Sequence, residues 1–357
     1  MSYSKAFTLQ GCTDSFQAIT LRAGVIFDDV YKFADAKNVT FIGGYAQGVG
    51  ASSGWLMGGG HSILTPVYGL GVDRVLQIKV VTPDGAYRIA NKCQNADLFW
   101  ALRGSGRGTF GVVIESTHLV EPKLTFQTTV ISFTPTPDNT RSFFELIVSN
   151  TVKWANEGWG GHVTDGGMIY VTPLLSLEEA AESMKAVTDY SITQGGTGLV
   201  ETSLSWLDFF TKYVVGHQGP IGQLIVLGTR LIPKSNFESE GGKTQLIDVL
   251  MDLRATLINI ATVTPILYNA TSATDTSVTP AWRDALWHLP QGARWSYNSS
   301  VPEIVGAQTF LHKFVDRFRA LAPDSGAYLN EAEVYETDHE AAFWGSNYAR
   351  LLQIKKK

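Results

Sequence analysis

The chain has 357 residues, of which 44% are hydrophobic and 17% are charged, and its formal net charge is −5. This composition supports one to three domains with a large buried core and excludes a disordered chain. The negative net charge gives no field that attracts a nucleic acid, and no apolar run reaches the roughly 18 residues of a membrane span, so we expect neither partner.

The first third of the chain alternates predicted elements with glycine-rich segments. Residues 26–37 place Ile26, Val30, Phe33 and Ala34 on one face of a helix, and NVTFIGG follows as a short strand. The stretch VLQIKVVTPDGAYRIAN predicts two strands joined by a Pro-Asp-Gly turn. A short helix in ADLFWALR then leads through the glycine-rich loop GSGRGTFG into the apolar strand VVIESTHLV.

The pattern changes near Glu121-Pro122, which predicts a domain boundary close to residue 123. Beyond it, strand-like runs such as FQTTVISFT, GMIYVTPLL and QLIVLGTRLI alternate with helices. Ser176 with Glu179 and Ser300 with Glu303 form helix capping boxes, the second before a helix over 301–321. We expect an α+β fold in which residues 124–315 form an antiparallel sheet covered by helices on one side.

The two cysteines, Cys12 and Cys93, are too few for a disulfide framework or a four-thiolate zinc site. One bridge between them is possible in an oxidising compartment. The first residues, MSYSKAF, predict no signal peptide, so the localisation stays open.

The segment GASSGWLMGGGHS, residues 50–62, is very rich in glycine and serine. Backbone without side chains can approach a ligand closely, and successive N–H groups can converge on an anion such as a pyrophosphate. Tight turns between packed elements are the alternative, and composition does not decide between the two. The chain has neither a Walker motif nor the strand-loop-helix order of a Rossmann fingerprint.

Three ordered blocks carry a family resemblance. They are GGYAQGVGASSGWLMGGGHSILTPVYGLGVDRVLQIKVVTPDG, NADLFWALRGSGRGTFGVVIESTHLV and YLNEAEVYETDHEAAFWGSNYARLLQIKK. Together they resemble the berberine bridge enzyme-like oxidoreductases of the vanillyl-alcohol oxidase superfamily, which has a PCMH-type FAD-binding fold, and the fungal branch in particular. The similarity covers most of residues 10–122 and 326–357.

The resemblance implies three regions and an FAD cofactor. Residues 1–122 would form the second subdomain of the FAD-binding domain, residues 123–315 the substrate domain, and residues 316–357 a segment that returns to the FAD domain. The residues implied to bind the cofactor are Gly48, Val49, Gly50, Ser52, Ser53, Gly54, Gly58, Gly59, Gly60, His61, Gly111, Val112, Val113 and Asn330.

The sequence also departs from the family pattern. Members have a further FAD subdomain before this region, with a Gly-His loop whose histidine usually attaches the flavin, and nothing before Phe7 supplies it. Residues 43–49, GGYAQGV, lack the cysteine that forms a second flavin bond in some members. The far end is also shorter. We therefore expect a chain truncated at both ends that binds FAD non-covalently at most.

The implied reaction oxidises a C–H bond next to an alcohol or amine in a small organic substrate of the secondary-metabolite type. Hydride would pass to the flavin, with O2 as the acceptor. Tyr328 is the first candidate for the catalytic base and needs a lowered pKa for that role. Glu331 is the second candidate, and Glu333, two residues further on, could also act as the base. Two carboxylates on one face of a strand could equally be solvated. The alternatives are a buried structural Tyr328 and, for the whole chain, a flavin-free, catalytically silent remnant or partner protein.

Other kinds of site have less support in the sequence. His162 and Asp165 have the chemistry of metal ligands, but no third ligand stands at a convincing spacing, so a polar turn is favoured. His217 and His288 are isolated along the chain. We therefore predict no metal site. The absence of a G-x-S-x-G motif leaves an esterase without support.

Overall fold

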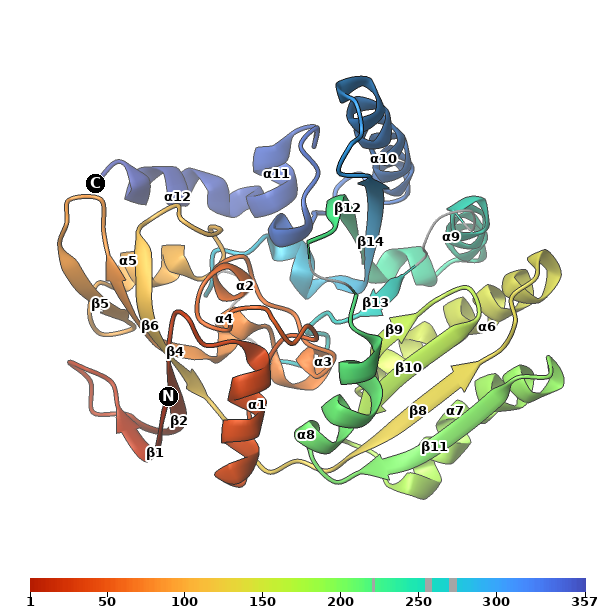
Figure 1. Cartoon of the computed structure of the whole chain (residues 1–357), viewed down its shortest axis with the longest axis horizontal. Helices are drawn as coiled ribbons and strands as arrows, with labels where there is room; N and C mark the ends of the chain where they lie inside the picture. The colour runs from red at the N-terminus through yellow and green to blue at the C-terminus, as the bar shows by residue number, and fades with distance from the viewer. Residues whose placement is uncertain (220–221, 254–258, 270–274) are drawn as a thin grey trace.

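Two large antiparallel sheets organise the chain in the computed structural model, which describes residues 1–219, 222–253, 259–269 and 275–357 (Figure 1). The first sheet has the strand order β1-β2-β6-β4-β5. Its strands are β1 (Ser2–Thr8), β2 (Ser15–Arg22), β4 (Val75–Val81), β5 (Tyr87–Asn91) and β6 (Val112–Leu119). Strands β3 (Val39–Thr40) and β7 (Glu121–Pro122) form a separate two-stranded sheet.

The predicted hairpin of the first sheet is confirmed. Strands β4 and β5 pair antiparallel, and the turn between them has Gly85 at φ +77°, a conformation that favours glycine. Helix α5 (Ala96–Leu102) follows where a short helix is predicted, and the glycine-rich loop after it leads into β6.

The first helix differs in detail from the prediction. Helix α1 (Phe27–Ala36) begins one residue after Ile26 and buries Phe27, Val30, Tyr31 and Ala34. The buried face thus includes Phe27 and Tyr31 in place of the predicted Ile26 and Phe33. Tyr31 can be buried because its hydroxyl donates a hydrogen bond to the Gly44 carbonyl oxygen at 2.5 Å. A buried phenol needs such a partner.

The second sheet has the strand order β11-β8-β10-β9-β13-β14-β12 and is antiparallel throughout. Its strands are β8 (Phe126–Ser132), β9 (Gly160–Val163), β10 (Gly167–Thr172), β11 (Thr197–Ser203), β12 (Leu224–Pro233), β13 (Ile260–Thr262) and β14 (Ala285–Trp295). Helices α6 (Pro137–Asn156), α7 (Leu177–Thr193), α9 (Glu240–Leu253) and α10 (Val301–Leu321) share one hydrophobic cluster with it. The α+β fold with helices on one face of an antiparallel sheet is confirmed.

Both predicted capping boxes are present. The Ser176 backbone N–H donates to the Glu179 carboxylate at 2.8 Å at the start of α7, and Ser300 donates to Glu303 at 2.7 Å at the start of α10. Each box satisfies amide groups that the first helical turn leaves without partners.

One predicted region limit lies between two strands, and the other lies inside a helix. The limit near residue 123 lies between β7, in the two-stranded sheet, and β8, the first strand along the chain in the seven-stranded sheet. The limit at residue 315 lies inside α10, which runs unbroken to Leu321. Helices α11 (His339–Trp344) and α12 (Tyr348–Lys355) follow, and Figure 1 shows α12 beside α5. The Arg350 guanidinium lies 4.0 Å from the centre of the Trp100 ring of α5, which fixes α12 to the region of the first sheet.

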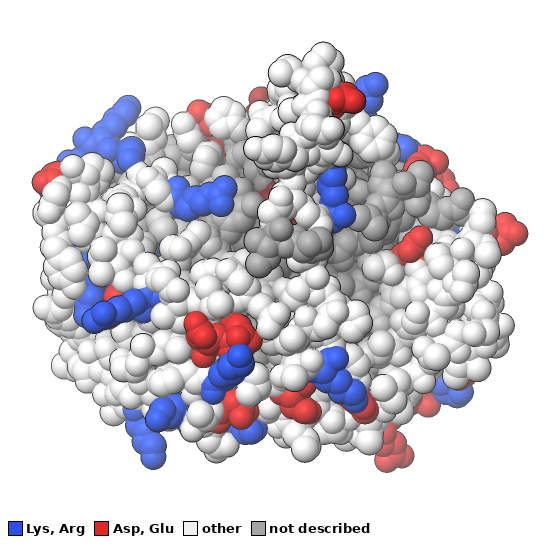
Figure 2. All heavy atoms as spheres, in the orientation of Figure 1, with Lys and Arg blue, Asp and Glu red and all other residues white. Residues whose placement is uncertain are grey.

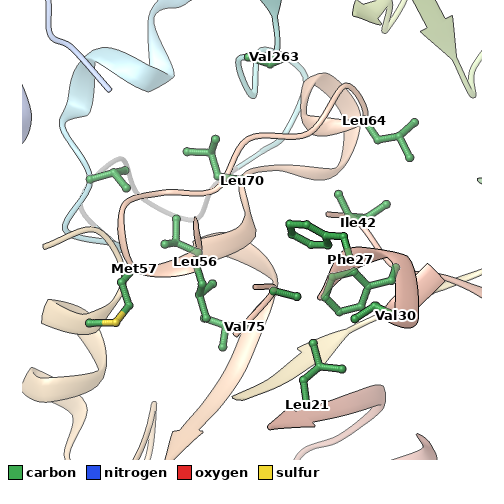
Figure 3. Close-up of a cluster of buried hydrophobic side chains, with 14 of the residues drawn as sticks. Leu21, Phe27, Val30, Ile42, Leu56, Met57, Leu64, Leu70, Val75 and Val263 are labelled. Atoms are coloured by element: carbon green, nitrogen blue, oxygen red, sulfur yellow. The ribbon is translucent and has the colours of Figure 1, made fainter. Parts of the chain in front are cut away.

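The glycine-rich segment is anchored by its apolar side chains. It contains the short helix α2 (Gly54–Met57), and the short helices α3 (Thr65–Tyr68) and α4 (Gly71–Arg74) follow it in the chain. Helix α8 (Trp206–Phe209) lies near α1. Leu56, Met57, Leu64 and Leu70 enter the same buried cluster as Phe27 of α1 (Figure 3). The bare backbone between them is thereby held against a packed core.

Charges of both signs are mixed on the face of the molecule that Figure 2 shows. Lys and Arg side chains are interspersed with Asp and Glu side chains on the face in Figure 2. Across the described residues, no helix has both the length and the apolar character needed to cross a membrane.

The buried His118 on β6 predicts a loss of stability in acid. Its Nε2 lies 2.6 Å from the Ser116 Oγ, and burial lowers the pKa of His118 to about 3. In the unfolded chain the pKa is about 6.5, so below that pH only the unfolded state takes up the proton. We expect a loss of about 2 kcal/mol of unfolding free energy from this group between pH 6.5 and pH 5.

Urea unfolding at both pH values measures this effect. The variant His118→Gln removes the titrating group, so its unfolding free energy should fall less between the two pH values than that of the unaltered protein. Equal losses in the two proteins would show that His118 does not carry this dependence.

Candidate active site

A cavity of about 870 Å³ lies between the glycine-rich segment, the start of β6 and the residues after α10. Its volume falls within the roughly 300–1,000 Å³ of small-molecule sites. Many of the residues predicted to form a site line its wall, namely Val49, Gly50, Ser53, Gly54, His61, Gly111, Val112, Val113, Tyr328, Asn330 and Glu331. Three sequence blocks that are far apart in the chain therefore meet at one cavity.

The other predicted residues do not line this cavity. Gly48 is exposed. Ser52 is fully buried, and its Oγ lies 2.5 Å from the Ser116 Oγ. The run Gly58, Gly59 and Gly60 packs against protein instead.

Close packing accounts for the glycine run. A Cβ at Gly58 would lie 2.2 Å from the Asn330 Oδ1, so a larger residue there would displace Asn330. Gly60 has φ +78°, and a Cβ would meet the Trp55 ring at 3.0 Å. These two glycines let the loop approach a side chain of the C-terminal segment and an indole ring.

Asn330 joins the two walls of the cavity. Its Nδ2 donates to the Trp55 carbonyl oxygen at 3.2 Å and to the Tyr328 hydroxyl at 2.8 Å. The Tyr328 backbone N–H in turn donates to the Thr229 Oγ1 on β12 at 2.9 Å. The segment that carries Tyr328 is thus fixed to both the glycine-rich segment and the second sheet.

Tyr328 is fully buried, and its environment does not favour the phenolate. Burial, together with the nearby Glu331 carboxylate, raises the pKa of Tyr328 well above its usual range. The described chain alone therefore does not supply the lowered pKa that a base requires.

Glu331 lies at the end of the short helix η5 (Leu329–Glu331) and contacts two imidazoles. Its Oε1 lies 3.2 Å from the His61 Nε2, and its Oε2 lies 3.5 Å from the His288 Nε2. Burial alone raises the pKa of Glu331, but His288 and His61 outweigh it and hold the pKa below its usual range. Glu331 is therefore a carboxylate at neutral pH.

Sequence reasoning missed the two histidines of the second sheet. His162 on β9 and His288 on β14 both pair with Ala261 of β13, which lies between them. Residues in register across neighbouring strands project from the same face of a sheet. Their sequence spacing carries no signal, because the three strands are joined by long connections.

Arg107 is a third residue that the sequence analysis did not select. It lines the cavity from the loop GSGRGTFG and adds a guanidinium to a wall made largely of glycine and apolar side chains. Phe27, Tyr45 and Trp55 provide aromatic surface in the same wall. The Arg between two glycines was the available signal for an anion site.

Comparison with known proteins shows which family the chain resembles. Residues 9–91 match the family model "FAD binding domain", and residues 327–357 match "Berberine and berberine like". Over its whole length the chain is 40% identical to the FAD-linked oxidoreductase ffsJ of Aspergillus flavipes, covering 64% of that protein. It is 38% identical to the FAD-linked oxidoreductase OXR2 of Pyricularia oryzae, covering 62% of it.

The chain is similar to the berberine bridge enzyme-like FAD-linked oxidoreductases in both matched segments and along its whole length. The fold agrees: the VAO-type flavoprotein MtVAO615 from Myceliophthora thermophila C1 superposes with a TM-score of 0.84, at 24% identity, over 99% of this chain and 67% of that one. The chain spans less than two thirds of the length of the two curated relatives.

FAD is the cofactor of this family, and the cavity fits it. A Cβ would lie 3.7 Å from the nearest protein atom at Gly50 and 3.5 Å from it at Gly54, and neither residue has a positive φ. Neither packing nor backbone conformation therefore requires glycine at these two positions of the wall. Space for a ligand that touches the main chain does.

Proposed function

We propose that this chain holds FAD in the cavity and oxidises a C–H bond next to an alcohol or amine of a small organic substrate, with O2 as the acceptor. The observation that carries the proposal is the shared cavity wall of the glycine-rich segment, the start of β6 and Tyr328 to Glu331. When bound, FAD supplies a hydride acceptor that no side chain offers.

The chain's own residues would bind the cofactor in two ways. The bare backbone at Gly50 and Gly54 lets main-chain N–H groups approach a pyrophosphate, and Arg107 offers the opposite charge. Gly111, Val112 and Val113 would present backbone to the adenine end. Phe27 and Trp55 supply apolar surface that excludes water from this wall.

Glu331 is the proton acceptor that we propose for the substrate hydroxyl or amine. It lines the cavity as a carboxylate, and its contact with His61 orients it. Tyr328 would act instead as a neutral hydrogen-bond donor that positions the substrate, because burial raises its pKa. Asn330 holds the Tyr328 hydroxyl in place.

Titration of the purified chain with FAD tests the proposal. We expect saturable binding, seen as quenched flavin fluorescence, and a visible flavin spectrum that remains with the protein after gel filtration. Protein that stays colourless and leaves the fluorescence unchanged would overturn the proposal and support a flavin-free partner protein.

Filling the cavity from Gly54 should weaken cofactor binding without loss of fold. In Gly54→Leu the new side chain has room on the protein side and helix α2 accepts leucine, but it occupies the cavity wall. We expect FAD affinity to fall by about tenfold or more, because steric exclusion removes contacts that share one association cost. Fluorescence titration gives the affinity, and thermal unfolding monitors the fold.

Gly24→Leu is the matched control. Gly24 is exposed, has no protein atom within 4 Å of a built Cβ and does not line the cavity. It should bind FAD like the unaltered chain. Equal affinity in the Gly54 and Gly24 variants would place the flavin elsewhere.

A further inference from the structure

Three metal-ligating side chains converge beside the cavity. The His61 and His288 imidazoles and the Glu331 carboxylate each offer one ligand atom, and these atoms lie within 4.8 Å of one another. They come from the glycine-rich segment, from β14 and from η5. Two histidines and one carboxylate are a common ligand set for zinc and for other divalent transition metals.

The three side chains are close enough to share one ion after the cluster contracts. Zinc takes nitrogen and oxygen ligands at about 2.0–2.2 Å, which places neighbouring ligand atoms about 3.4 Å apart in a tetrahedron. The His61 Nε2 lies 3.2 Å from the Glu331 Oε1, and the His288 Nε2 lies 3.5 Å from the other carboxylate oxygen, Oε2. The three ligand atoms lie within 4.8 Å of one another, so binding of an ion would draw them closer together.

The polar atoms of His288 point to a missing partner. Only 1% of this residue is exposed, and neither ring nitrogen has a hydrogen bond within the described residues. A buried polar group without a partner is costly, so native structures rarely leave one unsatisfied. The Nε2 of His162, in register with His288 on the same sheet face, also lacks a hydrogen-bond partner in the described part of the chain.

We propose that His61, His288 and Glu331 bind a divalent transition-metal ion of the Zn²⁺ class at the inner wall of the cavity. His61 and Glu331 also line the cavity, so the fourth ligand position is open to water or a small molecule on that side. The site itself does not depend on flavin.

The ion would also regulate the enzyme, a consequence that rests on the proposed function. In the proposed function the Glu331 carboxylate accepts a proton from the substrate. A metal ion bound to the carboxylate would occupy the lone pair that accepts this proton. Zinc should therefore inhibit oxidation, and a chelator should restore it.

Direct binding to the complete chain, without FAD or substrate, tests the site. Protein dialysed against a chelator and then against Zn²⁺ should retain about one equivalent, counted by mass spectrometry of the metal. Co²⁺ in its place should give the intense visible bands of four-coordinate cobalt. Absence of stoichiometric zinc would overturn the proposal even if FAD binds normally, whereas loss of FAD binding alone would leave it intact.

Matched variants locate the ion. His288→Phe keeps a ring beside Trp282 and Tyr328 but removes both nitrogens, and Glu331→Gln keeps the shape of the side chain. Each should weaken zinc binding by at least about 100-fold. His217→Ala removes an exposed histidine outside the cluster and should bind zinc like the unaltered chain. Unchanged affinity in both cluster variants, with native circular dichroism, would overturn the assignment.

Discussion

Replacing Glu331 with glutamine should slow reduction of the bound flavin by about 100- to 10,000-fold, the usual contribution of a positioned general base. The amide keeps the size of the side chain and its place beside His61 but cannot accept a proton. A panel of alcohols and amines that bleach the flavin under anaerobic conditions first supplies a substrate. Stopped-flow absorbance, with a chelator present, then gives the rate constant in each protein.

Glu333→Gln is the control for this experiment. Glu333 stands two residues further on, but it is buried against His312, whose Nδ1 lies 2.7 Å from its Oε1, and it does not line the cavity. Its rate of flavin reduction should equal that of the unaltered protein. A slow Glu333 variant beside a fast Glu331 variant would move the base to the other carboxylate.

Removal of the disulfide should cost about 4 kcal/mol of unfolding free energy, the value expected when a bridge closes a loop of this length. Cys12 and Cys93 are bonded to each other across 81 positions of sequence, with 5.8 Å between their Cα atoms. The bridge ties the β1–β2 connection to the end of β5, at the opposite edge of the first sheet. Chain entropy in the unfolded state increases when it is absent.

Chemical unfolding of Cys12→Ser/Cys93→Ser measures this loss. The unaltered protein should show no thiol that reacts with a labelling reagent under native conditions, and it should lose the same stability in reductant. A variant as stable as the unaltered chain would show that the first sheet holds its edges together without the bridge.

Local patterns predicted most of the elements. The turn chemistry of Pro83-Asp84-Gly85 and the capping boxes at Ser176 and Ser300 depend on neighbours within a few residues, and all are present. The rotated face of α1 was harder, because Tyr31 is buried through a contact with Gly44 that periodicity does not contain.

Some residues of the candidate site could be predicted from the sequence, and others depend on contacts between distant parts of the chain. Composition alone marked the glycine-rich segment as a candidate site. The family resemblance added Tyr328 and Glu331 to the predicted site. His288 and His162 could not be predicted as members of the site, because their proximity depends on strand register across β9, β13 and β14. The role of each glycine could be assigned only from the structure. Gly54 lines the cavity, whereas Gly58 leaves the space that the Asn330 side chain occupies.

The contact between Gly58 and Asn330 ties together two positions 272 residues apart, since a Cβ at the first would lie 2.2 Å from the side-chain oxygen of the second. Natural homologues should therefore covary at these positions, with a residue larger than glycine appearing only where the asparagine has become smaller. Directed evolution of this chain should mutate the pair in one library, because either change alone passes through a less fit intermediate.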